Sequence, residues 1–287
     1  MELPALEGVT HRTVSARGLE FHVAEAGAGE PVVLVHGWPQ HWWAWRRVVP
    51  LLAPHARLVM PDLRGFGWSA APPDGYDKQT MADDLLAVLD ALALRRVRLI
   101  GHDWGAWIGF LACLEAPERF ERFLAISSPT PMGRPGPRQA LEVWRFAYQL
   151  VLAAPALGER LVGSERFMQR LLETGTATLG TWTPDDLRLF SGVLAEPARA
   201  RASVQLYRTF LLREAGRTPR GRLHVPTRIV SGAKDPAIPP VLFAGAERQA
   251  DDLTVEIVPA CGHFVPEERP ELVAERALAL FGLGSAA

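Results

Sequence analysis

The sequence contains few lysines and few cysteines. Lys78 and Lys234 are the only lysines, and the remaining basic residues are arginines. The two cysteines, Cys113 and Cys261, lie far apart and show neither a paired pattern nor a spacing typical of metal ligands. We therefore expect no disulfide framework, no metal site, no cofactor and a reducing, cytoplasmic environment.

A long apolar run and an excess of one charge are also missing. No run approaches the roughly 18 residues of a membrane-spanning helix, and the first residues lack the basic start and apolar run of a signal peptide. The chain carries 31 basic and 32 acidic residues, for a formal net charge of -1. This balance indicates neither nucleic acid nor an anionic membrane surface as a partner. We expect a soluble cytoplasmic protein, a monomer or homodimer, that acts on a small molecule.

What the sequence does contain is a series of short apolar runs separated by segments with helical spacing. Uninterrupted runs of this kind are typical of strands covered on both faces of a parallel sheet. The runs lie at residues 31–37, 56–62, 97–101, 123–127, 225–232 and 253–258. Two alternating segments around Gly18, residues 11–17 and 19–25, predict an antiparallel hairpin at the sheet edge. The whole pattern predicts an α/β fold with right-handed crossovers.

The alternation of strands and helices is interrupted once. Between about Pro129 and Arg222 there is no buried β-branched run, and Leu, Ala, Arg and Trp recur at helical spacings. We therefore predict a first part of the α/β core at residues 1–128, a helical insert at 129–222 and a second part of the core at 223–287. Because ligands in open parallel sheets bind beyond the carboxyl ends of the strands, the site is expected between core and insert.

One helix start is marked in the sequence before the third apolar run. Thr80–Asp83 resembles a capping box, in which a Thr side chain and an acidic side chain three residues later bind free amides at a helix start. It predicts a helix from Met81 to Leu92, with Leu85 and Leu89 on its apolar face.

The segment from Val97 to Leu111 passes from strand character through a turn of small residues into helical character. This is the arrangement of a nucleophile elbow, in which small residues flank the nucleophile because the strand and helix backbones approach closely. Asp103 stands at its apex, between Gly101 and Gly105. An aspartate, with a reference pKa near ~3.9, is ionised at neutral pH and needs no base to activate it.

A base and a residue to orient it follow the last two predicted strands. His263 comes directly after the run at 253–258, and Asp235 follows the run at 225–232 in the same way. Taken alone, each would be read as an ordinary loop residue. Together with the elbow they give nucleophile, acid and base in the chain order of the α/β-hydrolase triad.

Four motifs together resemble those of the α/β-hydrolase-fold epoxide hydrolases, over nearly the whole chain. They are His36–Pro39, Asp62–Ser69, Gly101–Ala106 and Gly262–Phe264. The resemblance implies a mostly parallel central sheet flanked by helices, with the insert forming a helical cap. It also implies an oxyanion hole made by the backbone N–H groups of Trp38 and Trp104.

The resemblance further implies a pair of cap tyrosines whose hydroxyls hold the epoxide oxygen. Tyr148 and Tyr207 lie in the insert and resemble the two tyrosine segments of the family. The third tyrosine, Tyr76, lies in a loop before the predicted helix. Four residues are predicted to contact a small apolar substrate: Trp38, Trp104, Gln149 and Phe264.

The reaction that this resemblance implies is hydrolysis of an epoxide to a vicinal diol. Asp103 attacks a ring carbon while the two cap tyrosines hold the opening oxygen. Water activated by His263, which Asp235 orients, then hydrolyses the resulting ester. A serine in place of the aspartate would leave an ether that water cannot cleave.

Two alternatives stay open from the sequence. A haloalkane dehalogenase also uses an aspartate nucleophile, and Trp104 could donate to a halide. The second donor that such enzymes need would come from Trp144 or Trp182, since Trp38 occupies the place where an Asn often serves. The other alternative is a non-catalytic ligand-binding protein on this fold, which would be expected to lack a residue of the triad.

Overall fold

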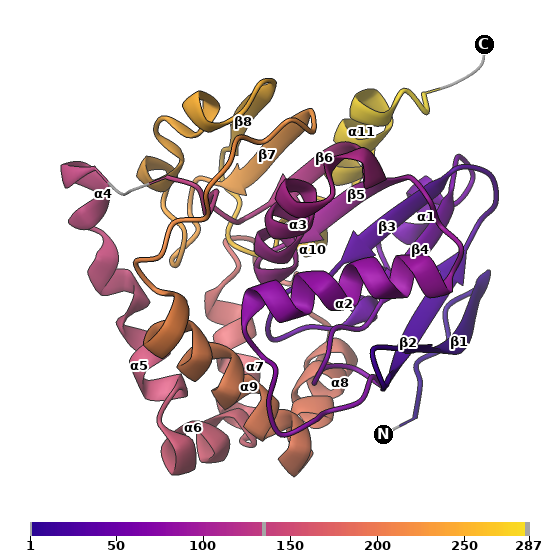
Figure 1. Ribbon diagram of the computed structural model, residues 1–287. Coiled ribbons are helices and arrows are strands. Elements are labelled where there is room, and N and C mark those ends of the chain that lie inside the picture. The colour runs from indigo at the N-terminus through magenta and orange to yellow at the C-terminus, as the bar shows by residue number, and fades with distance from the viewer. Residues whose placement is uncertain (1, 134–135, 285–287) are drawn as a thin grey trace.

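The computed structural model describes residues 2–133 and 136–284 (Figure 1). Residues 1, 134–135 and 285–287, at the two ends of the predicted core and within the predicted cap, lie outside the described residues. The described strands form one eight-stranded sheet. They are β1 (Val9–Ala16), β2 (Leu19–Ala26), β3 (Pro31–Val35), β4 (Arg57–Pro61), β5 (Val97–His102), β6 (Phe120–Ile126), β7 (Thr227–Gly232) and β8 (Leu253–Val258).

The sheet is parallel except at one edge, with the order β1-β2-β4-β3-β5-β6-β7-β8. β1 and β2 form a hairpin, and β2 pairs antiparallel with β4. Gly18 in the hairpin turn has φ 74°, a value that glycine adopts without steric cost. From β4 to β8 all neighbouring strands run parallel. The α/β fold class predicted from the sequence is confirmed.

Helices cover both faces of this sheet. On one face lie α2 (Lys78–Ala91) and α3 (Trp104–Glu115), which Figure 1 shows in front of the strands. The other face is covered by α1 (Val49–Leu52), α10 (Val265–Glu268) and α11 (Pro270–Phe281).

Alternate side chains of the central strands pack against the helices on opposite faces of the sheet. Val33 and Leu99 pack in the cluster that contains α2 and α3, whereas Val32 and Ile100 pack in the cluster that contains α11. Each strand is therefore buried on both faces, which is why its sequence reads as an uninterrupted apolar run.

The helix predicted to begin at Met81 begins one turn earlier. α2 starts at Lys78, and the carboxylate of Asp77 accepts a hydrogen bond from the amide of Thr80 at 2.8 Å. The capping-box prediction at Thr80 is wrong because Asp77 already caps the first turn. This shift places Lys78 inside the helix.

The insert between β6 and β7 is helical in its described residues and contains no strand there. In Figure 1 the helices α5 to α9 gather on one side of the sheet. They are α4 (Pro137–Ala140), α5 (Tyr148–Leu152), α6 (Pro155–Val162), α7 (Glu165–Thr174), α8 (Pro184–Leu194) and α9 (Pro197–Thr209), followed by a π-helical turn, Phe210–Glu214. The exact division into core and cap stays a prediction.

No helix within the described residues is both long enough and apolar enough to span a membrane.

Candidate active site

Asp103 occupies a sharp turn between β5 and α3. Its backbone has φ 53° and ψ -122°, a conformation that is strained for any residue other than glycine. The amide of Asp103 donates to the carbonyl of Ile126 on β6 at 2.9 Å, which ties the turn to the neighbouring strand. Strain of this kind persists where the surroundings hold it, and it is concentrated at functional sites.

The glycines around Asp103 are required by close backbone approaches. A Cβ on Gly105 would lie 2.3 Å from the carbonyl oxygens of Val35 and His36. A Cβ on Gly37 would lie 2.4 Å from the Cβ of Asp103. Gly105, one of the small residues that predict the elbow from sequence, thus lets the start of α3 approach the end of β3. Gly37 lets the loop after β3 approach Asp103.

His263 lies between Asp103 and Asp235. Its Nδ1 is 2.7 Å from Oδ2 of Asp235, and its Nε2 is 3.5 Å from Oδ2 of Asp103. The other oxygen of Asp235 accepts from the amides of Ala237 and Ile238 at 2.8 and 2.9 Å. The structure therefore brings together the three residues predicted as a triad, and it fixes the carboxylate of Asp235 from both sides.

Two carboxylates control the charge of His263. Burial alone would lower its pKa, but the charge of Asp235 and the hydrogen bond to Asp103 outweigh burial and raise the pKa of His263 to about 10. His263 is therefore an imidazolium at neutral pH.

The backbone of His263 is held by groups that the sequence did not single out as functional. Its carbonyl accepts from Ser127 Oγ at 2.7 Å and lies 3.0 Å from Nε2 of His102. Burial and the neighbouring His263 lower the pKa of His102 to about 4, so its ring is neutral and donates through Nε2. Ser127 directly follows β6 with φ 50°, and only its place at a strand end could have signalled this role.

Trp38 and Trp104 flank Asp103 from two elements. The amide of Trp38 donates to Oδ1 of Asp103 at 2.9 Å, and its indole donates to Ser203 at 3.0 Å. Trp104 opens α3, and its ring meets the rings of Tyr207 and Phe210 with centroids 5.9 and 4.9 Å apart. The amide of Trp38 thus lies where an oxyanion-hole donor is predicted.

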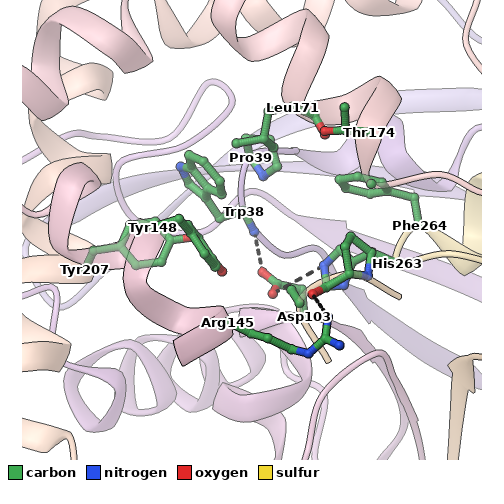
Figure 2. A pocket seen from close by; sticks show the side chains of 13 residues that line it. Trp38, Pro39, Asp103, Arg145, Tyr148, Leu171, Thr174, Tyr207, His263 and Phe264 are labelled. Carbon is green, nitrogen blue, oxygen red and sulfur yellow. Dashed lines mark hydrogen bonds and ion pairs between the residues drawn. The ribbon is translucent and has the colours of Figure 1, made fainter. Parts of the chain in front are cut away.

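Tyr148 and Tyr207 face Asp103 from the insert. Tyr148 begins α5 and Tyr207 lies in the last turn of α9, and their ring centroids are 6.1 Å apart. Figure 2 shows the two rings on the same side of the Asp103 carboxylate, opposite His263. Burial first, and nearby charge second, raise the pKa of both hydroxyls, so both are protonated donors at neutral pH.

Two cavities are both lined by Asp103. A cavity of about 270 Å³ is lined by Asp103 and Tyr148 together with Trp38 and Phe264. A second cavity of about 720 Å³ is also lined by Asp103 and Tyr148, and its wall contains Trp104 and the buried Gln149. The predicted substrate-contacting residues therefore all line one of the two cavities.

The first cavity also contains a residue that the sequence analysis missed. Arg145 lines it beside Asp103, donates to the carbonyl of Pro236 at 3.1 Å and pairs with Glu142 at 2.6 Å (Figure 2). It thereby links the insert to the loop that carries Asp235. Among the described residues, no group of three or more His, Cys, Asp or Glu side chains could hold a metal ion.

Comparison with known proteins supports the assignment made from the motifs. The family model described as the alpha/beta hydrolase fold matches residues 30–270. A soluble epoxide hydrolase of Corynebacterium sp. (strain C12) is 30% identical over 286 residues, which cover 95% of this chain and 97% of that protein. The chain belongs to the α/β-hydrolase-fold epoxide hydrolase family.

Solved structures share this fold, and one of them is an epoxide hydrolase. The ligand-free epoxide hydrolase CorEH is 30% identical and superimposes with a TM-score of 0.83, covering 96% of this chain and 99% of that one. Wild-type Cfl2 from Burkholderia cenocepacia is 31% identical, with a TM-score of 0.83 and 98% coverage of both chains. The family and fold class expected from the motifs are therefore confirmed.

Proposed function

We propose that this protein hydrolyses epoxides to vicinal diols through a covalent ester on Asp103. The observation that carries the proposal is the arrangement of Asp103 between His263 on one side and the hydroxyls of Tyr148 and Tyr207 on the other. Its relatives named as epoxide hydrolases support the same reaction.

In the first step Oδ2 of Asp103 attacks a ring carbon. Oδ1 is held by the Trp38 amide, so Oδ2 is the attacking atom. A carbon–oxygen bond forms to the enzyme while the ring carbon–oxygen bond breaks, and its electron pair goes to the ring oxygen. Tyr148 and Tyr207 hydrogen-bond to this oxygen, and one of them supplies the proton that leaves a neutral hydroxyl.

In the second step water cleaves the ester at the Asp103 carboxyl carbon. Ester formation removes the charge of Asp103, one of the two carboxylates that raise the pKa of His263. His263 then gives up its proton more readily, and this proton returns to the tyrosinate left by ring opening. The neutral imidazole accepts a proton from the attacking water while Asp235 holds its Nδ1, which restores the imidazolium. The amides of Trp38 and Trp104 bind the developing oxyanion, and the carboxylate is regenerated.

The cavities suit an apolar substrate whose ring lies at their junction. Leu171 and Phe264 line the smaller cavity, and Phe146 and Leu211 line the larger one. We propose that apolar substituents occupy these walls while the ring oxygen meets the tyrosines.

The alternative of halide chemistry is disfavoured by where the other tryptophans lie. A halide site needs a second N–H donor besides Trp104. The indole of Trp182 already donates to the carbonyl of Leu172 at 3.1 Å, and Trp144 is 67% exposed and packs on Arg145. The alternative of a non-catalytic ligand-binding protein is disfavoured because all three triad residues are present and in contact.

The deciding experiment compares purified wild-type protein with Asp103→Asn. Both are assayed with styrene-type and aliphatic epoxides and with bromoalkanes. Diol formation by the wild type and its loss in Asp103→Asn are expected. Bromide release without diol formation would replace the proposal with dehalogenation, and binding of these compounds without turnover would replace it with a receptor role.

A further inference from the structure

Lys78 is a fully buried lysine that the proposed reaction does not use. It has 0% exposure and stands in the first turn of α2. Its Nζ donates to the carbonyls of Tyr76 and Leu206 at 3.1 and 2.9 Å and to Oε2 of Glu214 at 3.0 Å. The ammonium therefore has three acceptors, one for each of its protons.

Glu214 binds Lys78 twice. Besides the ammonium, its carboxylate accepts the backbone amide of Lys78 at 2.6 Å. Glu214 ends the π-helical turn Phe210–Glu214 that follows α9, where the chain leaves the insert. One residue pair thus joins the start of α2 in the core to the end of the insert.

The same ammonium contacts the surroundings of the nucleophile. Its acceptor Leu206 directly precedes Tyr207 in α9. Its Nζ also lies 4.8 Å from the centroid of the Trp104 ring and 5.4 Å from that of Phe210. Lys78 therefore contacts both the helix turn that carries Tyr207 and the residue that follows Asp103.

A buried ammonium is costly unless it is paired and hydrogen-bonded. Burial lowers the pKa of Lys78, and the charge of Glu214 acts in the opposite direction. An apolar side chain could fill this space with a smaller desolvation cost. What it could not do is bind Leu206, Glu214 and the Trp104 ring at the same time.

We propose that Lys78 and Glu214 form a positioning pair that fixes Tyr207 relative to Asp103 for ring opening. This inference rests on the proposed epoxide hydrolysis. Neither residue touches the reacting atoms; both act through the placement of the Tyr207 hydroxyl. Since ring opening depends on that hydroxyl and ester cleavage depends on His263, loss of the pair slows the first step and spares the second.

The test separates the two steps with the epoxide that the wild type converts fastest. Ring opening is followed by rapid-quench mass spectrometry as the rate of adduct formation in a His263→Gln background. Adding Lys78→Met to that background removes the charge and hydrogen bonds but keeps a side chain of similar length. We expect ring opening to slow by about 10- to 100-fold, the range typical of a misplaced catalytic group.

Ester cleavage is measured in the presence of His263, as the decay of the adduct after a single turnover. Lys78→Met alone is expected to leave this rate within about twofold of the wild type, as independent groups act in the two steps. Glu214→Gln removes the charge but keeps an oxygen to accept the backbone amide, so a smaller slowing of ring opening is expected.

A matched control is available on the other side of the insert. Arg46 and Asp186 form a second buried core–insert pair, at 2.7 Å, whose contacts lie with Trp43, Phe190 and Glu267. Asp186→Asn is expected to lower the melting temperature without changing the ratio of the two rate constants.

The outcomes distinguish this inference from the proposed function. If the wild type makes no diol and no adduct forms in His263→Gln, the proposed function fails. The positioning role is overturned if diol and adduct both form but ring opening is as fast with Lys78→Met as without it in the His263→Gln background. It is also overturned if Lys78→Met slows both steps equally. Should Lys78→Met fail to fold, an unchanged ring-opening rate in Glu214→Gln overturns it instead.

Discussion

Nε2 of His263 lies 3.5 Å from Oδ2 of Asp103, so the predicted base and nucleophile are in direct contact in the free protein. The contact pairs an imidazolium with a carboxylate. In the proposed reaction, the first step neutralises Asp103 and so changes the environment of His263, the group needed for the second step.

This contact predicts a pH-dependent stability. The pKa of His263 is raised from 6.5 to about 10, against the opposing effect of burial, by Asp235 and Asp103. Between these two pH values the folded state binds one more proton than the unfolded state. The charged His263 therefore contributes its full amount to the free energy of unfolding below pH 6.5, and this contribution is lost as pH rises toward 10. Urea unfolding at a series of pH values checks this: the stability advantage of wild type over His263→Gln should shrink from pH 7 to pH 10, and a constant difference would contradict it.

Replacement of His263 with Gln should stop the reaction between its two steps. Asp103 and the tyrosines are unchanged, so the ester forms, but no base activates water. Intact-protein and peptide mass spectrometry with an epoxide should therefore find a stable adduct on Asp103 in the variant and none that persists in the wild type. An adduct on a different residue would require another nucleophile.

The elbow predicts a large stability effect from one methyl group. Gly105→Ala would place a Cβ 2.3 Å from two carbonyl oxygens, Val35 O and His36 O. These are backbone atoms at the end of a buried strand, so they cannot move away without a large energetic cost. We expect a loss of about 3 kcal/mol or more, the size typical of overpacking in a core. Gly284→Ala is the matched control, since a Cβ there meets no atom within 4 Å and should change stability by less than about 0.5 kcal/mol. Urea denaturation measures both.

Local patterns in the sequence were sufficient for the sheet and for much of the site. Buried strands read as apolar runs because both faces are covered, and Asp103, Asp235 and His263 each follow such a run. Their convergence follows from parallel strands that end at one edge of the sheet.

Contacts between segments far apart in the chain could not be predicted from local sequence patterns. Lys78 and Glu214 stand 136 positions apart and carry no motif, so only the folded chain reveals their pairing. The outward orientation of Trp144 also depends on packing of the insert, which helical spacing alone does not specify. The start of α2 was misplaced because Asp77 and Thr80 are both good N-cap residues, and tertiary contacts of Lys78 favour the earlier one.

The three tyrosines allow the role of the cap hydroxyls to be tested with an internal control. Tyr148→Phe and Tyr207→Phe each remove one hydrogen-bond donor to the epoxide oxygen. Each should therefore slow adduct formation by about 100-fold, the lower end of the range of rate losses for removal of one oxyanion-hole donor. Tyr76→Phe also removes a buried hydroxyl, but that hydroxyl donates to the carbonyl of Pro72 at 2.7 Å.

Tyr76→Phe should therefore cost about 1 kcal/mol of stability and leave ring opening unchanged. Adduct formation in a His263→Gln background measures all three variants on the same step. Because bromide is a leaving group that needs no proton, bromoalkane turnover, if present, should be much less sensitive to the two cap substitutions. Equal rates of ring opening for Tyr207→Phe and Tyr76→Phe would remove Tyr207 from the mechanism and, with it, the reason for Lys78 to hold it.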